Sequence, residues 1–157
     1  MWITFIWVGK TKNKHWAALE QNYLDRIEHF VPSQIHIVRE SKGALHPAMV
    51  DKALERIGEA ILKAVRPQAF VVLLDERGAQ LASRDLASLI AQKQNEGSPG
   101  ITFIVGGATG VAPTVGKRAD FKLSLSSMTF PHEMARTVLL EQVYRAFAII
   151  HNLPYPK

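Results

Sequence analysis

The amino-acid sequence predicts an α/β fold in which helices cover both faces of a mainly parallel β-sheet. Three observations support this prediction: five apolar stretches have the length of strands, helical patterns separate them, and two of the stretches are almost continuously apolar. Alternation of strands with helices is typical of a parallel sheet. The continuously apolar stretches, 70–74 and 101–105, indicate central strands that are buried on both faces.

The first half of the chain contains two predicted strands and two predicted helices. An apolar stretch at 2–8 predicts a buried first strand. Apolar residues then recur every three or four positions from Trp16 to Phe30, which predicts a helix, and a short strand follows at 35–38. A second helix is expected after Pro47, since proline is favoured in a first helical turn. Its apolar positions are Val50, Leu54, Ile57, Ile61 and Val65.

The second half continues the alternation. The strand at 70–74 precedes a helix for which Ser83 is the expected N-cap and which stops before Gly97. The strand at 101–105 runs into a glycine-rich segment.

The last strand is expected at 121–125, and the last helix starts near Thr129 or Phe130 with Pro131 in its first turn. This helix carries apolar residues at Met134, Val138, Leu139, Val143, Phe147 and Ile150.

The composition is that of one globular domain. The chain has 157 residues, of which 47% are hydrophobic and 21% charged, a balance that favours neither disorder nor a membrane protein. The absence of cysteine excludes disulfides, thiolate zinc sites and a cysteine nucleophile, and it fits a reducing compartment. The apolar N-terminus lacks a basic leader and is too short to span a bilayer. We therefore expect a single cytoplasmic domain over residues 1–157.

The charge balance is basic, with 19 Lys and Arg against 14 Asp and Glu and a net charge of +5. A positive charge attracts polyanions, although many small proteins are basic for solubility alone. Lys10, Lys12, Lys14 and His15 cluster directly after the first predicted strand. This segment is therefore a candidate for contact with phosphates.

Function is expected in the loops that begin at Asp75, Gly106 and Ser126, because parallel sheets bind ligands beyond the carboxyl ends of their strands. In the first loop, Asp75, Glu76 and Arg77 precede Gly78. Two interpretations are open. The segment is either a polar turn in which Gly78 supplies a positive φ, or a ligand edge where carboxylates bind a ribose or an amino group and Arg77 binds a phosphate.

The second loop, Gly106-Gly107-Ala108-Thr109-Gly110, follows a strand directly. It matches neither the G-x-G-x-x-G dinucleotide fingerprint nor a P-loop. Adjacent glycines let the backbone approach a flat or charged ligand, but on its own this loop favours a plain turn between a strand and a helix.

The third loop leads from Ser126 through small hydroxyl residues to a helix start near Pro131. A helix N-terminus presents unpaired N–H groups that suit a carboxylate, a phosphate or a polar base edge. His132 and Arg136 share a face near that terminus, although a lone histidine there is usually a surface residue. The histidines show no metal-ligand spacing, so no metal is expected.

Together and in this order, four sequence blocks resemble the RlmH family of ribosomal large-subunit pseudouridine N3-methyltransferases, within the SPOUT superfamily. The blocks are Leu-Leu-Asp-Glu-Arg-Gly, Ile-Val-Gly-Gly-Ala-x-Gly, Leu-Ser-Leu-Ser-x-Met-Thr-Phe-Pro-His and Leu-x-Glu-Gln-x-Tyr-Arg-Ala-Phe. The resemblance covers essentially the whole chain, including the Asn-x-Pro-Tyr tail. It implies a C-terminal trefoil knot, a homodimer, S-adenosylmethionine as methyl donor, and a pseudouridine of 23S rRNA in the assembled ribosome as substrate.

The same resemblance implies the site residues. The cofactor pocket would be formed by Leu74, Gly106, Gly107, Leu125, Ser126, Ser127, Met128, Thr129, Phe130 and Pro131. Candidates for contact with RNA phosphates are Lys10, Lys12, Lys14, Arg77, Arg136 and Arg145. For Arg145 a simpler interpretation is an i,i+4 ion pair with Glu141 on an exposed helix face.

The residue that accepts the proton from the target nitrogen is left open by the sequence. In the family, a C-terminal Tyr-His pair is the natural candidate, but this chain has Pro156 after Tyr155, and proline can neither act as a base nor donate a hydrogen bond. The remaining candidates are Glu76, His132 and Tyr155. Solvent could also take the proton from an anion that is held by Lys157 or an arginine.

Three alternative functions are consistent with parts of the pattern. The first is a SPOUT methyltransferase that acts on tRNA or on another rRNA base. The second is a noncatalytic RNA-binding or ribosome-binding module, which the missing tail histidine favours. The third is an ordinary doubly wound nucleotide-binding protein, which the absence of both phosphate fingerprints argues against.

Overall fold

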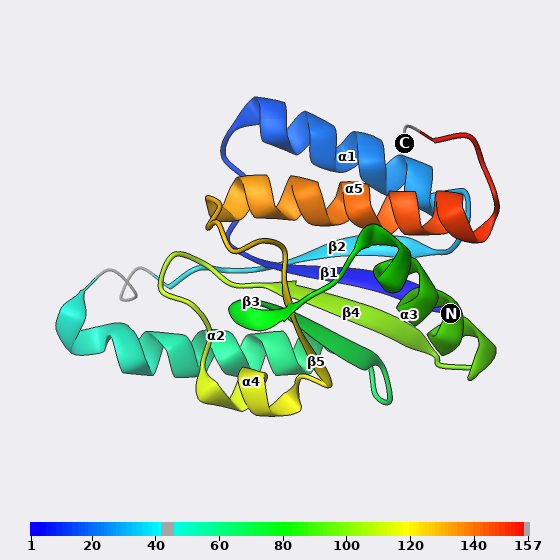
Figure 1. Ribbon diagram of the computed structural model, residues 1–157. Helices are drawn as coiled ribbons and strands as arrows, with labels where there is room; N and C mark the ends of the chain where they lie inside the picture. The colour runs from blue at the N-terminus through cyan, green and yellow to red at the C-terminus, as the bar shows by residue number, and fades with distance from the viewer. Residues whose placement is uncertain (42–45, 156–157) are drawn as a thin grey trace.

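Five parallel strands form the central sheet of the computed structural model, which describes residues 1–41 and 46–155 (Figure 1). The strand order is β2-β1-β4-β3-β5, and each neighbouring pair is parallel. The strands are β1 (Trp2–Val8), β2 (Ser33–Val38), β3 (Phe70–Gln80), β4 (Gly100–Val105) and β5 (Phe121–Ser124).

Helices cover both faces of this sheet (Figure 1). The larger core cluster joins three helices to one face, and α2 and α4 pack on the other. The helices are α1 (Lys14–Glu28), α2 (Val50–Ala64), α3 (Ser83–Asn95), α4 (Pro113–Arg118) and α5 (His132–Ile150), with a 3-10 turn η2 (Pro47–Met49) before α2. The predicted α/β fold is therefore confirmed. Within the described part of the chain, no helix combines the length and the hydropathy needed to cross a membrane.

Successive side chains of a strand point to opposite faces of the sheet, so one sheet contributes to two hydrophobic cores. In β1, Phe5 and Trp7 face α1 and α5, while Ile6 and Val8 face the α2 side. Every residue of β4 is buried, as the continuous apolar stretch predicts for a central strand.

Two predicted helix starts differ from the structure by a few residues. Helix α5 begins at His132 with Pro131 as its N-cap, two to three residues after the predicted start. Ser83 is the first helical residue of α3 and not its N-cap, which is Ala82. The Ser83 hydroxyl donates instead to Oε1 of Gln142 in α5, at 2.6 Å, because the close packing of α3 on α5 offers a tertiary partner.

Strand β3 does not end at Leu74 as the sequence predicts. Both Leu74 and Ala79 pair with Leu123 of β5, so residues 75–78 form a bulge within the strand. Gly78 has no positive φ, which makes the interpretation of a simple glycine turn wrong. A Cβ at Gly78 would lie 2.5 Å from the carbonyl oxygen of Lys122, so the glycine is needed for the close approach of β5.

A buried polar cluster fixes the start of α5 to the end of β1. The guanidinium of Arg136, a fully buried side chain, donates from Nη2 to the carbonyl oxygen of Val8 at 2.7 Å and from Nη1 to Oγ1 of Thr11 at 2.9 Å. The Thr11 hydroxyl in turn donates to Oε1 of Glu20 in α1 at 2.8 Å. Burial lowers the pKa of Arg136, and the negative charge of Glu20 opposes that shift.

Prediction for Arg136. Replacing Arg136 with Met should lower the free energy of unfolding by about 3 kcal/mol, because the Val8 carbonyl and the Thr11 hydroxyl lose their buried donor and Glu20 loses the positive charge that faces it. Urea unfolding followed by circular dichroism measures this loss. The control Arg77→Met removes an exposed arginine and should change stability by less than about 0.5 kcal/mol. Equal stability of the two variants would contradict the assigned role of Arg136.

Prediction for Glu20. Burial raises the pKa of the Glu20 carboxyl above its usual value. A raised pKa in the folded state means that the stability linked to Glu20 is fully present below the usual glutamate pKa and is lost as pH rises through the raised value. Glu20→Gln keeps an oxygen that accepts from Thr11 but does not titrate. In urea titrations at several pH values, the variant should gain stability relative to the wild type as pH rises, and a constant difference would contradict this.

Candidate functional site

Two adjacent cavities lie at the carboxyl edge of the sheet, with volumes of about 180 and 650 Å3. Both are lined by Leu74, Asp75, Glu76, Phe130 and His132, so they form one continuous cleft. Together they have the size of a site for a small molecule or cofactor. We therefore take this cleft as the candidate active site.

The smaller cavity is mostly apolar. Leucines of β3 and β5 and the end of β4 form its wall, and the first turn of α5 closes it. The residues involved are Leu74, Val105, Leu123, Leu125, Met128, Phe130 and Ala135. Such a wall suits a flat apolar ring such as a nucleobase.

The larger cavity is more polar. The β3 bulge supplies Asp75, Glu76 and Arg77, the loop after β4 supplies Gly106 and Gly107, and α5 supplies His132. The Asp75 carboxylate accepts from the backbone N–H of Arg77 at 2.9 Å, which stabilises the bulge. The interpretation of residues 75–77 as a ligand edge is thus supported by their position in the cleft.

Side-chain hydrogen bonds shape the loop that follows β5. The Ser124 hydroxyl donates to the carbonyl oxygen of Ser126 at 3.0 Å, and the Ser126 hydroxyl accepts from the backbone N–H of Met128 at 3.0 Å. The Ser127 hydroxyl accepts from Nε2 of Gln80 at 2.9 Å. Ser127 is the one residue of the predicted cofactor set that lines neither cavity of the cleft.

The glycine-rich loop depends on its glycines for its own shape. A Cβ at Gly106 would lie 2.9 Å from Cγ1 of Val111, and Gly107 forms an isolated bridge with Gly110, whose φ is +81°. The glycines therefore allow the loop to fold back on itself beside the cleft. A bulky residue at Gly106 would disturb the loop before it could block a ligand.

Among the predicted phosphate contacts, Arg136 is wrong. Its side chain is 0% exposed and binds Val8 and Thr11, so RNA cannot reach it. The i,i+4 spacing with His132 showed only that the two residues are near each other on α5. Burial against the end of β1 could not be read from that spacing.

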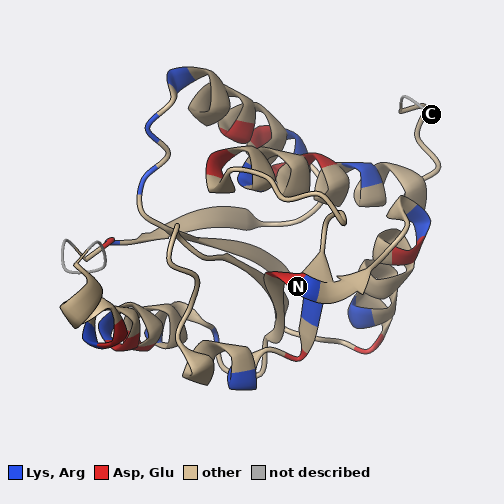
Figure 2. Cartoon of the chain, turned by 60° about the vertical axis from the view of Figure 1, so that its left-hand side comes forward, with Lys and Arg blue, Asp and Glu red and all other residues tan. Residues whose placement is uncertain are grey.

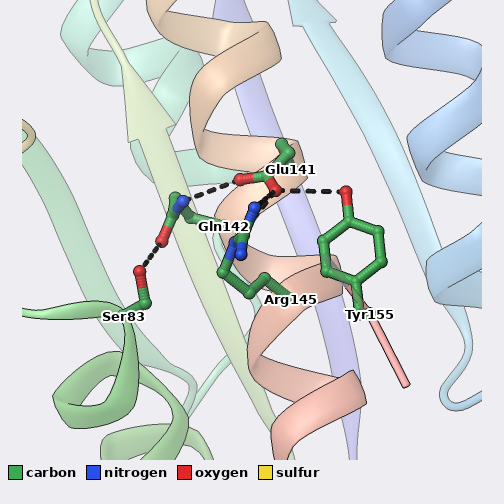
Figure 3. A network of polar contacts seen from close by, with 5 residues as sticks. All are labelled: Ser83, Glu141, Gln142, Arg145 and Tyr155. Atoms are coloured by element: carbon green, nitrogen blue, oxygen red, sulfur yellow. Dashed lines mark hydrogen bonds and ion pairs between the residues drawn. The ribbon is translucent and has the colours of Figure 1, made fainter. Parts of the chain in front are cut away.

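Arg145 and Tyr155 lie towards the other end of α5, in the network shown in Figure 3. The Arg145 guanidinium contacts Oε1 of Glu141 at 2.5 Å, which confirms the predicted ion pair, although both side chains are only partly exposed. The Tyr155 hydroxyl donates to the same oxygen at 3.1 Å. Burial raises the pKa of Tyr155, which makes its hydroxyl a weaker acid at neutral pH.

Tyr155 lines neither cavity of the cleft. Helix α5 has 19 residues, and at a rise of 1.5 Å per residue it separates the two ends of the helix by about 27 Å. Pro156 and Lys157, the other tail positions singled out in the sequence, lie outside the described residues.

Exposed lysines lie on the loop that joins β1 to α1 and in the first turn of α1. Lys10, Lys12 and Lys14 are exposed, while Thr11 between them is buried. Figure 2 shows these basic positions along the loop and at the first turn of α1. Arg77 is also exposed and lines the larger cavity.

The structure adds residues to the lining of the cleft that the sequence did not single out. They are Leu73, Val105, Val111, Leu123, Ser124 and Ala135. The positions of Val105 and Leu123 near the ends of predicted strands could have suggested them. Ala135 could not be found in this way, because its place in the cleft depends on how α5 packs against the sheet. Among the described residues, no group of three or more His, Asp or Glu side chains is placed to hold a metal.

Comparison with known proteins gives the family. A family profile described as "Predicted SPOUT methyltransferase" matches residues 1–156. The chain is 40% identical to "Ribosomal RNA large subunit methyltransferase H" of Carboxydothermus hydrogenoformans, over 100% of both proteins. It is also 40% identical to the protein of that name in Geobacter sulfurreducens, over 99% of each. The chain belongs to this family of SPOUT methyltransferases.

Solved structures with low identity share the fold of this SPOUT methyltransferase. A probable methylase family protein of Haemophilus influenzae has a TM-score of 0.61 at 14% identity, covering 99% of this chain and 70% of its own. A probable methyltransferase of Bordetella pertussis has a TM-score of 0.60 at 12% identity, covering 92% and 93%. The fold therefore persists where most side chains differ.

Prediction for Ala135. A large side chain at Ala135 should fill the smaller cavity, so Ala135→Trp should weaken binding of S-adenosylhomocysteine at least about tenfold. Isothermal titration calorimetry measures the affinity. The matched control Ala18→Trp, on an exposed position of α1, should bind as the wild type does. Thermal unfolding of each variant shows whether it is folded. Unchanged affinity in a folded Ala135→Trp variant would place the ligand elsewhere.

Proposed function

We propose that this protein transfers a methyl group from S-adenosylmethionine to N3 of a pseudouridine in 23S ribosomal RNA. The observation that carries this proposal is the cleft, where the β3 bulge, the Gly106-Gly107 turn and the 125–132 segment meet at the carboxyl edge of the sheet. Full-length relatives named ribosomal RNA large subunit methyltransferase H support the substrate class.

The residues of the cleft fit the methyl donor. Leu74, Leu123 and Leu125 offer an apolar surface for adenine, and the carboxylates of Asp75 and Glu76 can accept from ribose hydroxyls or an amino group. Backbone N–H groups of the loops after β4 and β5 are candidate hydrogen-bond donors, beside the side chains of Arg77, Thr129 and His132. These acceptors and donors suit a ligand that combines a purine, a ribose and an amino acid.

In this reaction the main task of the protein is to position the target nitrogen relative to the methyl donor. The sulfonium of the bound donor supplies an already activated methyl group. The cleft has to hold the target nitrogen in line with that methyl and exclude competing orientations. N3 must also lose its proton, and His132 is the best-placed base because it lines both cavities and its side chain is of the type that most often accepts protons at neutral pH. Glu76, which lines the same two cavities, is the second candidate.

Tyr155 can take part only from another copy of the chain, since it lies far from the cleft of its own protomer. A homodimer, which the family resemblance implies, would permit this. The trefoil knot and the single domain over residues 1–157 likewise stay predictions from the resemblance and the sequence. We further propose a cytoplasmic location and the assembled ribosome as the form in which the RNA is recognised.

RNA phosphates are proposed to contact the exposed Lys10, Lys12 and Lys14 and also Arg77, which is exposed and lines the larger cavity. Arg145 remains a weaker candidate because its guanidinium is engaged by Glu141 and stacks 4.8 Å from the ring of Tyr155.

Prediction for methyl transfer. Mass spectrometry of rRNA from cells that lack this gene should show the loss of one methylated pseudouridine, and the wild-type gene should restore it. His132→Ala should lower the rate of transfer to unmethylated ribosomes by about 10²-fold or more, with S-adenosylhomocysteine still bound. An unchanged rRNA spectrum would contradict the proposed function. An unchanged rate in His132→Ala would transfer the role of base to Glu76 or to a partner subunit.

A further inference from the structure

The basic loop between β1 and α1 is fastened to the first turn of α5 by a carboxylate that the proposed reaction does not otherwise use. Oε1 of Glu133 accepts from the backbone N–H of Lys12 at 3.0 Å and from the backbone N–H of Asn13 at 2.9 Å. These contacts join positions 120 and 121 residues apart in the chain. One carboxylate oxygen thus binds the backbone N–H groups of Lys12, the central lysine of the cluster, and of Asn13.

The rest of the loop is held just as firmly. Arg136, one helical turn after Glu133, binds the Val8 carbonyl and the Thr11 hydroxyl, and the side chain of Asn13 accepts from the backbone N–H of His15 and so caps α1. The backbone from Val8 to Asn13 is therefore anchored at both ends and at Thr11. The exposed lysine side chains project from a fixed support.

The helical turn that holds this loop also forms a wall of the cleft. His132 precedes Glu133 and lines both cavities, and Ala135 lines the smaller one. The lysine cluster and the methyl-donor cleft consequently share one turn of α5. A phosphate bound by the lysines would lie at a fixed place relative to the reacting methyl group.

We propose that Glu133 is a positioning residue for the RNA substrate: its two backbone hydrogen bonds set the Lys10–Lys14 loop against the cleft, so that phosphate contact places the target base in line with the methyl donor. This inference rests on the proposed function. Glu133 itself touches neither the RNA nor the donor, and acts through the loop.

The negative charge of Glu133 would by itself weaken RNA binding, whereas its role in positioning the loop would strengthen it. A negative side chain beside three lysines weakens their attraction for phosphates, so a purely electrostatic role predicts tighter RNA binding when the charge is removed. A positioning role predicts weaker and less productive binding when the acceptor oxygen is removed. Glutamine separates the two effects, because it keeps an acceptor oxygen but carries no charge.

The test compares Glu133→Ala, Glu133→Gln and the control Glu59→Ala, which removes an exposed carboxylate from α2 on the opposite face of the sheet. Each variant is assayed with unmethylated ribosomes from cells that lack the gene. The readouts are kcat/KM for methyl transfer, ribosome affinity as a function of salt, and affinity for S-adenosylhomocysteine alone. Thermal unfolding confirms that each variant is folded.

Glu133→Ala should lower kcat/KM for ribosomes by about tenfold or more, because a small displacement of a positioned substrate is costly to the reaction rate. Its affinity for S-adenosylhomocysteine should stay within about twofold of the wild type, since only the loop is released. The slope of log affinity against log salt should become shallower by about one unit for each phosphate contact that is lost. Glu133→Gln should restore most of the wild-type behaviour, and Glu59→Ala should retain all of it.

A double-mutant cycle adds a direct measure of the coupling. Lys12→Ala removes a side chain but leaves the backbone N–H that Glu133 holds, and its effect on ribosome affinity should shrink when Glu133 is already Ala.

The inference is overturned if Glu133→Ala keeps the wild-type kcat/KM and salt slope, if Glu133→Gln fails as badly as Glu133→Ala, or if the Lys12 effect is the same in both backgrounds. A wild-type protein that transfers no methyl group to ribosomes overturns the proposed function itself, and the inference with it.

Discussion

The buried guanidinium of Arg136 is the contact on which the arrangement of this protein depends. It binds the last carbonyl of β1 and, through Thr11, the Glu20 carboxylate of α1, and so joins the first strand, the first helix and the last helix at one point. Removing a charge from water is costly, and the partners of Nη1 and Nη2, together with the nearby negative charge of Glu20, offset that cost for Arg136. The position of the first turn of α5 at the carboxyl edge of the sheet is therefore tightly restricted. The cleft and the lysine loop both take their geometry from it.

The parallel direction of the strands brings the walls of the cleft together. Because all five strands point the same way, the bulge of β3, the glycine turn after β4 and the hydroxyl-rich loop after β5 come together at one edge. Segments that are about thirty and fifty residues apart in sequence become walls of one cleft. The charged residues of the bulge reach the cleft because β3 stops pairing with β5 after Leu74 and resumes pairing at Ala79.

Sequence reasoning was most successful where hydrophobic periodicity is strong. The five strands and the four longer helices agree with the structure. Nine of the ten expected cofactor residues line the cleft, and their contact with a cofactor stays a prediction. It failed where tertiary contacts decide: Gly78 serves close strand packing and not a turn, Ser83 bonds to Gln142 and not to its own helix end, and Arg136 is buried. The short helix α4 was missed because six residues give too little periodicity. Glu133 could not be singled out either, since its partners are backbone groups more than a hundred residues away.

The central claim is that the cleft at the carboxyl edge holds a methyl donor. A crystal structure of the protein grown with S-adenosylhomocysteine tests it most directly. We expect density for the ligand between Leu74 and Phe130, with the adenine against the leucines of β3 and β5 and the sulfur facing His132. Ligand density at a different surface, with this cleft unchanged, would contradict it.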